Sequence, residues 1–162
     1  MHDADRCVLD HFAAVRNRTI ELVERVPEGL LDRTPEGEGM PLRWHLVHVA
    51  DGPDWWLTNV LRDGGTWSWP PPYAEQPGGL TQGLAASRDR VLRFFEAGDG
   101  ERMGEAFTAV WDDHKHEWLG RDRVLYLTDH EIHHRGRIVL ALMQWGFGDF
   151  PGDEIVWPPT AE

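Results

Sequence analysis

Residues 130–137 read His-Glu-Ile-His-His-Arg-Gly-Arg, and two of these histidines, His130 and His134, are four residues apart. On a helix this spacing places two side chains on the same face with Cβ atoms about 5–6 Å apart, so both imidazoles could reach one metal ion. Such a pair is half of a metal site, because a metal held by histidines needs at least one more protein ligand. A fourth position left to water would distinguish a reactive site from a structural one.

The rest of the chain predicts the helices that would position these residues. Hydrophobic spacing and helix breakers predict long helices over about residues 3–26, 41–61, 80–97 and 121–145. A short turn is expected at Leu30 and Leu31, and a kink at Gly52-Pro53 is considered for the second helix. Alternating residues from Ala106 to Trp118 predict a small β-hairpin before the last helix. We therefore expect an all-α four-helix bundle that forms a single domain over residues 1–162.

Composition and charge argue against several classes of function. The formal net charge is −12 and Lys115 is the only lysine, whereas nucleic-acid binders gain affinity from clustered basic residues. No apolar run approaches the roughly 18–20 residues that span a bilayer, and the charged N-terminus does not resemble a signal peptide. Cys7, the only cysteine, is compatible with a reducing compartment and is expected to be a small buried side chain rather than a catalyst. We expect a cytoplasmic protein that binds neither nucleic acid nor membrane.

The second predicted helix offers the missing ligand. His45 and His48 are three residues apart in the stretch Trp44-His-Leu-Val-His-Val-Ala-Asp51, so they share roughly one side of the helix. In four-helix bundles metal sites are built from side chains on facing helices. Either histidine could therefore complete a site with His130 and His134.

Two segments resemble the signatures of a known family. Residues 42–57, with a histidine amid Leu-Val and paired tryptophans after it, and residues 129–145, from Asp-His-Glu-Ile-His-His-Arg-Gly-Arg to Gln-Trp, are similar to the DinB superfamily of metal-dependent four-helix bundles. The resemblance extends over essentially the whole domain. It implies a metal triad of His48, His130 and His134. The family usually has Gln after His-Arg-Gly, where this chain has Arg137.

The resemblance also implies a range of functions. Similar proteins include thiol transferases that use mycothiol, bacillithiol or glutathione, a maleylpyruvate isomerase, and members without known activity. Three neutral imidazoles leave a divalent ion its full charge, so a bound thiol or water becomes more acidic. We expect a Zn, Ni or Fe ion that activates a low-molecular-weight thiol toward a small electrophilic substrate. The alternatives are a hydrolase in which the metal activates water, or a bundle whose metal is not catalytic.

Several residues near the expected triad could have either a functional or a structural role. Trp44, His45 and Trp55 are predicted to bind substrate, although His45 could instead be a fourth ligand and the tryptophans, with Trp56, could simply pack the core. His133 is expected at the surface or in a dimer contact, with a homodimer as one option for the oligomeric state.

A zinc peptidase is the rival enzyme class. His130-Glu131-Ile-His-His134 satisfies the H-E-x-x-H pattern, in which the Glu is the general base. Arg137 stands where the extended metzincin pattern has Gly, and no third histidine follows. Glu154 could serve as a downstream carboxylate ligand, but it lies in a Pro/Gly-rich tail rather than on a helix. We therefore expect Glu131 to support the ligands or to face solvent.

Overall fold

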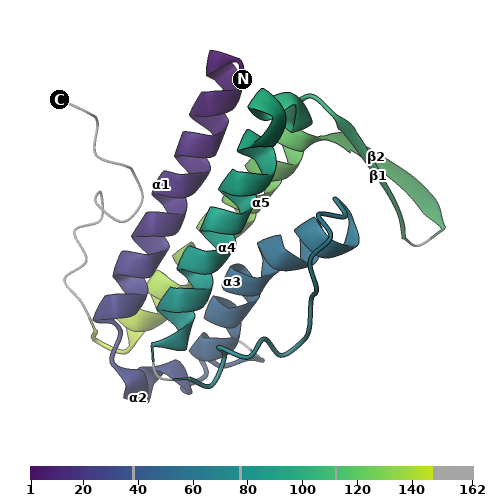
Figure 1. The fold of residues 1–162 in the computed structure, drawn as a ribbon. Coiled ribbons are helices and arrows are strands. Elements are labelled where there is room, and N and C mark those ends of the chain that lie inside the picture. The colour runs from purple at the N-terminus through teal and green to yellow at the C-terminus, as the bar shows by residue number, and fades with distance from the viewer. Residues whose placement is uncertain (38, 77, 112, 148–162) are drawn as a thin grey trace.

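The computed structural model describes residues 1–37, 39–76, 78–111 and 113–147. Its long helices are α1 (Asp3–Arg25), α3 (Leu42–Asn59), α4 (Gly79–Glu96) and α5 (Gly120–Gln144). The shorter elements are α2 (Glu28–Leu31), the 3₁₀ helix η1 (Ala97–Met103) and the strands β1 (Ala106–Trp111) and β2 (His114–Leu119). The long helices lie side by side, and the hairpin projects from the end where α5 begins (Figure 1). The predicted helical bundle with a hairpin before the last helix is confirmed.

The long helices enclose a core with two apolar regions. Helix α1 packs on α4 and α5, and α3 packs on the same two helices, so the four form a closed ring. One apolar cluster, around Leu46 and Leu142, lies toward α2, and the other, around Phe12 and Phe95, lies toward η1. The helices also carry buried polar side chains, among them Arg16, Thr19, Ser87, Glu131, His134 and Arg135. Buried polar groups need hydrogen-bond or ion-pair partners, and here the partners are other side chains and backbone carbonyls.

Arg16 on α1 contacts each of the other three long helices, α3, α4 and α5. Helix α3 continues through Pro53, which has no N–H group and cannot bond to the carbonyl of Val49. The Nη2 atom of Arg16 donates to that carbonyl at 3.1 Å, while Nη1 donates to Ser87 Oγ on α4 at 3.0 Å. The Val49 carbonyl, which Pro53 cannot bond, therefore receives its hydrogen bond from a side chain of another helix.

The hairpin is antiparallel, and its register pairs Ala106 with Leu119 and Trp111 with His114. Phe107 and Ala109 on β1 and Trp118 on β2 pack against the apolar cluster near η1, as the alternation predicts. The helix η1 was not predicted, because Gly98, Asp99 and Gly100 all have positive φ, a local geometry that periodicity does not reveal.

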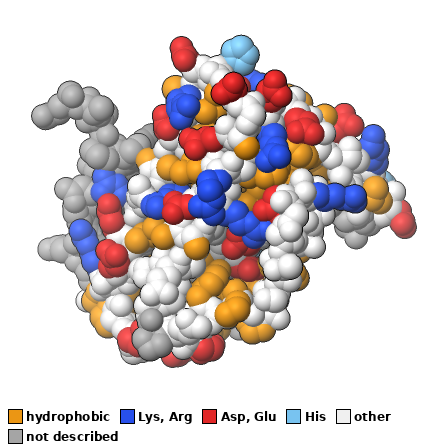
Figure 2. All heavy atoms as spheres, in the orientation of Figure 1, with side chains coloured by type: hydrophobic (Ala, Val, Ile, Leu, Met, Phe, Trp, Pro, Cys, Tyr) orange, Lys and Arg blue, Asp and Glu red, His pale blue; other side chains and the backbone are white. Residues whose placement is uncertain are grey.

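The surface agrees with the composition. On the described part of the face in Figure 2, acidic and basic side chains are interspersed and do not form a continuous basic patch. Within the part of the chain that the structure describes, every helix is too short or too polar to cross a bilayer.

Candidate metal centre

Three histidines from two facing helices meet near the middle of the bundle. His48 comes from α3, and His130 and His134 are one turn apart on α5. One ring nitrogen of each lies within 4.8 Å of the others, and Nε2 of His48 is 3.0 Å from Nε2 of His130. Nitrogens bound to one tetrahedral zinc at about 2.0–2.1 Å lie about 3.3 Å apart, so this cluster could hold a metal ion after small adjustments. It is the one such group of three among the described residues.

The electrostatic setting favours neutral imidazoles. Burial lowers the pKa of His48, and it lowers the pKa of His130 to about 4 and of His134 to about 3, with the neighbouring histidines acting in the same direction. Neutral imidazole is the form that binds metal. The three side chains are therefore in the ligand form at neutral pH without an ion to displace their protons.

Aromatic rings fix two of the candidate ligands. Trp44, one turn before His48, stacks on its ring with centroids 4.9 Å apart and an interplanar angle of 8°. Tyr126, one turn before His130, lies nearly parallel to that ring at 6.0 Å. These contacts restrict rotation of both imidazoles, so less side-chain entropy is lost when an ion binds.

His45 contacts the third candidate ligand from inside the bundle. Its Nδ1 atom lies 3.4 Å from Nδ1 of His134, and its side chain is buried. This contact leaves Nε2 of His134 for an ion. A second group on the far nitrogen of a metal-binding histidine fixes its tautomer and ring orientation.

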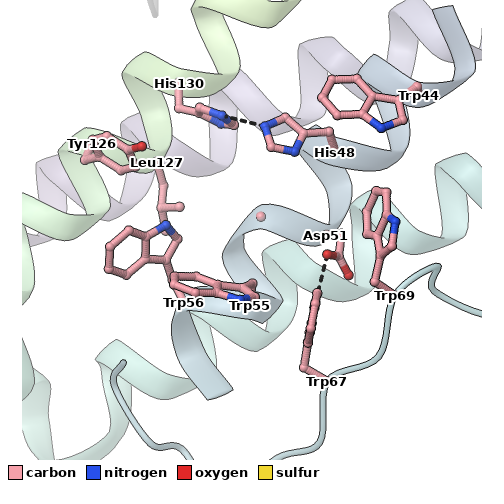
Figure 3. A pocket seen from close by; sticks show the side chains of 11 residues that line it. Trp44, His48, Asp51, Trp55, Trp56, Trp67, Trp69, Tyr126, Leu127 and His130 are labelled. Atoms are coloured by element: carbon pink, nitrogen blue, oxygen red, sulfur yellow. Dashed lines mark hydrogen bonds between the residues drawn. The ribbon is translucent and has the colours of Figure 1, made fainter. Parts of the chain in front are cut away.

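A cavity of about 420 Å³ adjoins the cluster. His48 and His130 form part of its wall (Figure 3). The other lining residues are mostly aromatic, and they are Trp44, Asp51, Gly52, Trp55, Trp56, Trp67, Trp69, Tyr126 and Leu127. The volume is in the range of small-molecule sites.

One carboxylate faces this cavity. Asp51 lies one turn after His48 on α3, and its Oδ2 atom accepts a hydrogen bond from Trp67 Nε1 at 2.8 Å (Figure 3). Burial raises the pKa of Asp51, and the hydrogen bond from Trp67 acts in the opposite direction. Asp51 is not part of the histidine group that could hold an ion.

Behind one wall of the cavity, Arg123 is enclosed by aromatic rings. Its guanidinium carbon lies 3.7 Å from the ring centre of Trp56, 4.2 Å from Trp118 and 4.6 Å from Tyr126. Burial lowers the pKa of Arg123 to about 10, so the side chain stays charged at neutral pH. The cation–π contacts join the cavity wall to the hairpin.

Glu131 does not occupy the position of a peptidase base. Its carboxylate lies 2.8 Å from Nε of Arg16, both side chains are 1% exposed, and Glu131 does not line the cavity. The expectation that it could face solvent is wrong. Its partner on α1 lies far away in the sequence, so no local pattern indicates the ion pair. Glu154, the other residue of the peptidase hypothesis, lies outside the described residues.

The predicted substrate residues separate into two groups. Trp44 and Trp55 line the cavity, whereas His45 lies outside its wall and contacts His134. His133 is exposed on α5, as expected. Cys7 is exposed on α1, so the expectation that it is buried is wrong.

Six lining residues were not predicted, and they are Asp51, Gly52, Trp67, Trp69, Tyr126 and Leu127. Helical spacing from His48 and His130 could have indicated Asp51 and Tyr126. The two tryptophans belong to the Pro-rich segment before α4, whose path has no periodic signal.

Comparison with known proteins agrees with the geometry. A model of the DinB superfamily matches residues 11–138, which include the three clustered histidines and most of the four long helices. None of the curated proteins compared with the sequence matches it. The family match covers more than half of the chain, and the chain therefore belongs to the DinB superfamily.

Proposed function

We propose that this protein is a metal-dependent transferase. A divalent ion held by His48, His130 and His134 would activate a low-molecular-weight thiol, which then attacks a small electrophile. The observation that carries the proposal is that His48 and His130 belong both to the histidine cluster and to the wall of the cavity. An ion at the cluster would therefore face a space that can hold a substrate.

The donor set suits this role. When bound, a divalent ion surrounded by three neutral imidazoles lowers the pKa of a thiol or water ligand toward neutrality. No carboxylate belongs to the histidine group of the described residues, so the protein would not offset the charge of the ion with a ligand. Imidazole ligands bind Zn, Ni and Fe alike, so the ligand type does not select one of these metals.

The protein's own side chains would bind and orient the reactants. The tryptophans of the cavity exclude water and offer flat apolar surfaces to the electrophile. In the transfer the thiol loses its proton to solvent, its sulfur bonds to the electrophilic carbon, and the leaving group departs with the bonding electrons. Cys7 does not line the cavity, so the thiol must come from a second substrate.

A spectroscopic titration tests the proposal. Protein loaded with Co²⁺ is titrated with mycothiol, bacillithiol and glutathione, and a sulfur-to-cobalt charge-transfer band is expected with one of them. That thiol is then incubated with a panel of electrophiles, and conjugates are identified by mass. His48→Ala protein is the control, which should show neither band nor product. Absence of a band together with metal-dependent ester hydrolysis would assign the site to hydrolysis, and absence of both would make the metal non-catalytic.

A further inference from the structure

The lining of the cavity has an unusual chemical character. Apart from the histidines and Tyr126, Asp51 is the only ionisable group among the lining residues that the structure describes, and none of them is Lys or Arg. Five of the lining residues are tryptophans. Aromatic faces carry partial negative charge and the ionised carboxylate carries a full one, so the lining around Asp51 offers partners for a positive ligand group.

Asp51 lies where it can meet a ligand. Asp51 is only 5% exposed, and its Oδ2 atom accepts the hydrogen bond from the Trp67 N–H group, which leaves Oδ1 available to a ligand. Figure 3 shows the carboxylate between α3 and the segment that carries Trp67 and Trp69. Burial raises the pKa of Asp51, which means that its ionised form is held in a poorly solvating site. A positive ligand group beside it would stabilise that form.

The tryptophans around Asp51 can serve the same ligand group. Trp67 and Trp69 are 37% and 45% exposed, so their rings border the opening of the cavity. Arg123, which does not line the cavity, already stacks on Trp56 at 3.7 Å and lies 4.6 Å from the Tyr126 ring. Those two rings therefore already contact a cation, whereas no Lys or Arg of the described chain stacks on Trp67 or Trp69. Rings grouped about one carboxylate are typical of sites for organic ammonium groups.

We propose that the cavity selects an organic cation, a small molecule with an ammonium group that binds between Asp51 and the rings of Trp67 and Trp69. The opposite end of the molecule would extend toward His48 and His130. The proposal rests on the proposed function in taking this cavity as the substrate site, and it adds the chemical class of the substrate. The net charge of −12 acts in the same direction, because it raises the local concentration of cations.

Binding of matched probes to the metal-free protein tests this proposal. Choline carries a trimethylammonium group, 3,3-dimethyl-1-butanol has the same shape without charge, and 3,3-dimethylbutanoate is an anion. Titrations followed by tryptophan fluorescence should show that choline binds about tenfold more tightly than the neutral alcohol, the ratio expected from a partly desolvated cation–π and ionic contact. The anion should bind most weakly.

Variants locate the site. Asp51→Asn keeps the shape and an oxygen acceptor for Trp67, and it should weaken choline binding about tenfold while leaving the alcohol unchanged. Asp54→Asn is the matched control, because Asp54 lies on the same helix, pairs with Arg90 at 3.0 Å and does not line the cavity. Choline binding should be unchanged in this control. Trp69→Leu provides a second test if Asp51→Asn does not fold, and it should also weaken choline binding.

The outcomes separate this proposal from the proposed function. Equal affinity for choline and the alcohol, or an unchanged choline affinity in both Asp51→Asn and Trp69→Leu, would overturn the inference of a cationic substrate. Selective choline binding without any thiol band in the cobalt protein would support the inference and contradict the thiol-transfer function. A thiol band in the cobalt protein together with equal binding of choline and the alcohol would support the thiol-transfer function and contradict the inference of a cationic substrate.

Discussion

Glu131 and Arg16 form an ion pair of 2.8 Å in which both side chains are 1% exposed. Glu131 stands between His130 and His134 in the sequence, but its charge is used to join α5 to α1. Because removal of one partner leaves the other charge buried, Glu131→Gln should lower the free energy of unfolding by about 3 kcal/mol. Urea denaturation measures this change. Metal content of the folded variant should remain that of the wild type.

The matched control is Glu21→Gln, which removes a carboxylate that contacts Arg18 at 2.8 Å but is 48% exposed. Surface pairs contribute little, so this change should stay within about 0.5 kcal/mol. Equal effects of the two substitutions would contradict the structural role of Glu131. Peptide cleavage by the wild type that disappears in Glu131→Gln would instead revive the peptidase hypothesis.

His45 should affect metal binding without being a ligand. Its Nδ1 atom lies 3.4 Å from Nδ1 of His134, so His45→Ala removes the group that orients that ring. Metal affinity, measured by competition with a chromophoric chelator, should fall about tenfold to a hundredfold, while one ion per chain still binds at saturation. His133→Ala is the control, because His133 is also next to His134 but is exposed. If both variants bind metal like the wild type, His45 does not support the site.

The metal-free protein should lose stability in mild acid. Burial lowers the pKa of His130 to about 4 and of His134 to about 3, whereas histidines of the unfolded chain titrate near about 6.5. Between these values the unfolded state binds more protons, so the free energy of unfolding falls as the pH falls. The urea midpoint of protein treated with EDTA should therefore be lower at about pH 5 than at about pH 7.5. His130→Gln, which lacks one of these groups, should show a smaller decrease, and an equal decrease would exclude His130 as a cause.

The bundle and the histidine pair could be predicted because both depend on local spacing. His130 and His134 share a helix face by their separation alone, and the apolar periodicity of each long helix is visible in the sequence. His48 needed the family resemblance, since spacing alone left His45 as an equal candidate. The structure separates the two, because His48 points to His130, whereas the Nδ1 atom of His45 approaches Nδ1 of His134.

The parts that could not be predicted depend on contacts between distant segments. Arg16 meets Glu131 and the carbonyl of Val49 only after three helices assemble, and no periodic pattern encodes that meeting. Trp67 reaches Asp51 from a segment rich in Pro and Gly, where the backbone path is set by turns rather than by a repeating face. The three histidines could therefore be predicted from the sequence, whereas most of the residues that line the cavity could not.

Metal stoichiometry tests the account most directly. The wild type and His134→Ala are saturated with Zn²⁺, freed of loosely bound ion by gel filtration, and measured by elemental mass spectrometry. The three-histidine site predicts one ion per chain in the wild type and most of that ion lost in the variant, with the helical circular dichroism of the two proteins alike. One ion per chain in folded His134→Ala protein would contradict the assignment of the metal to His48, His130 and His134.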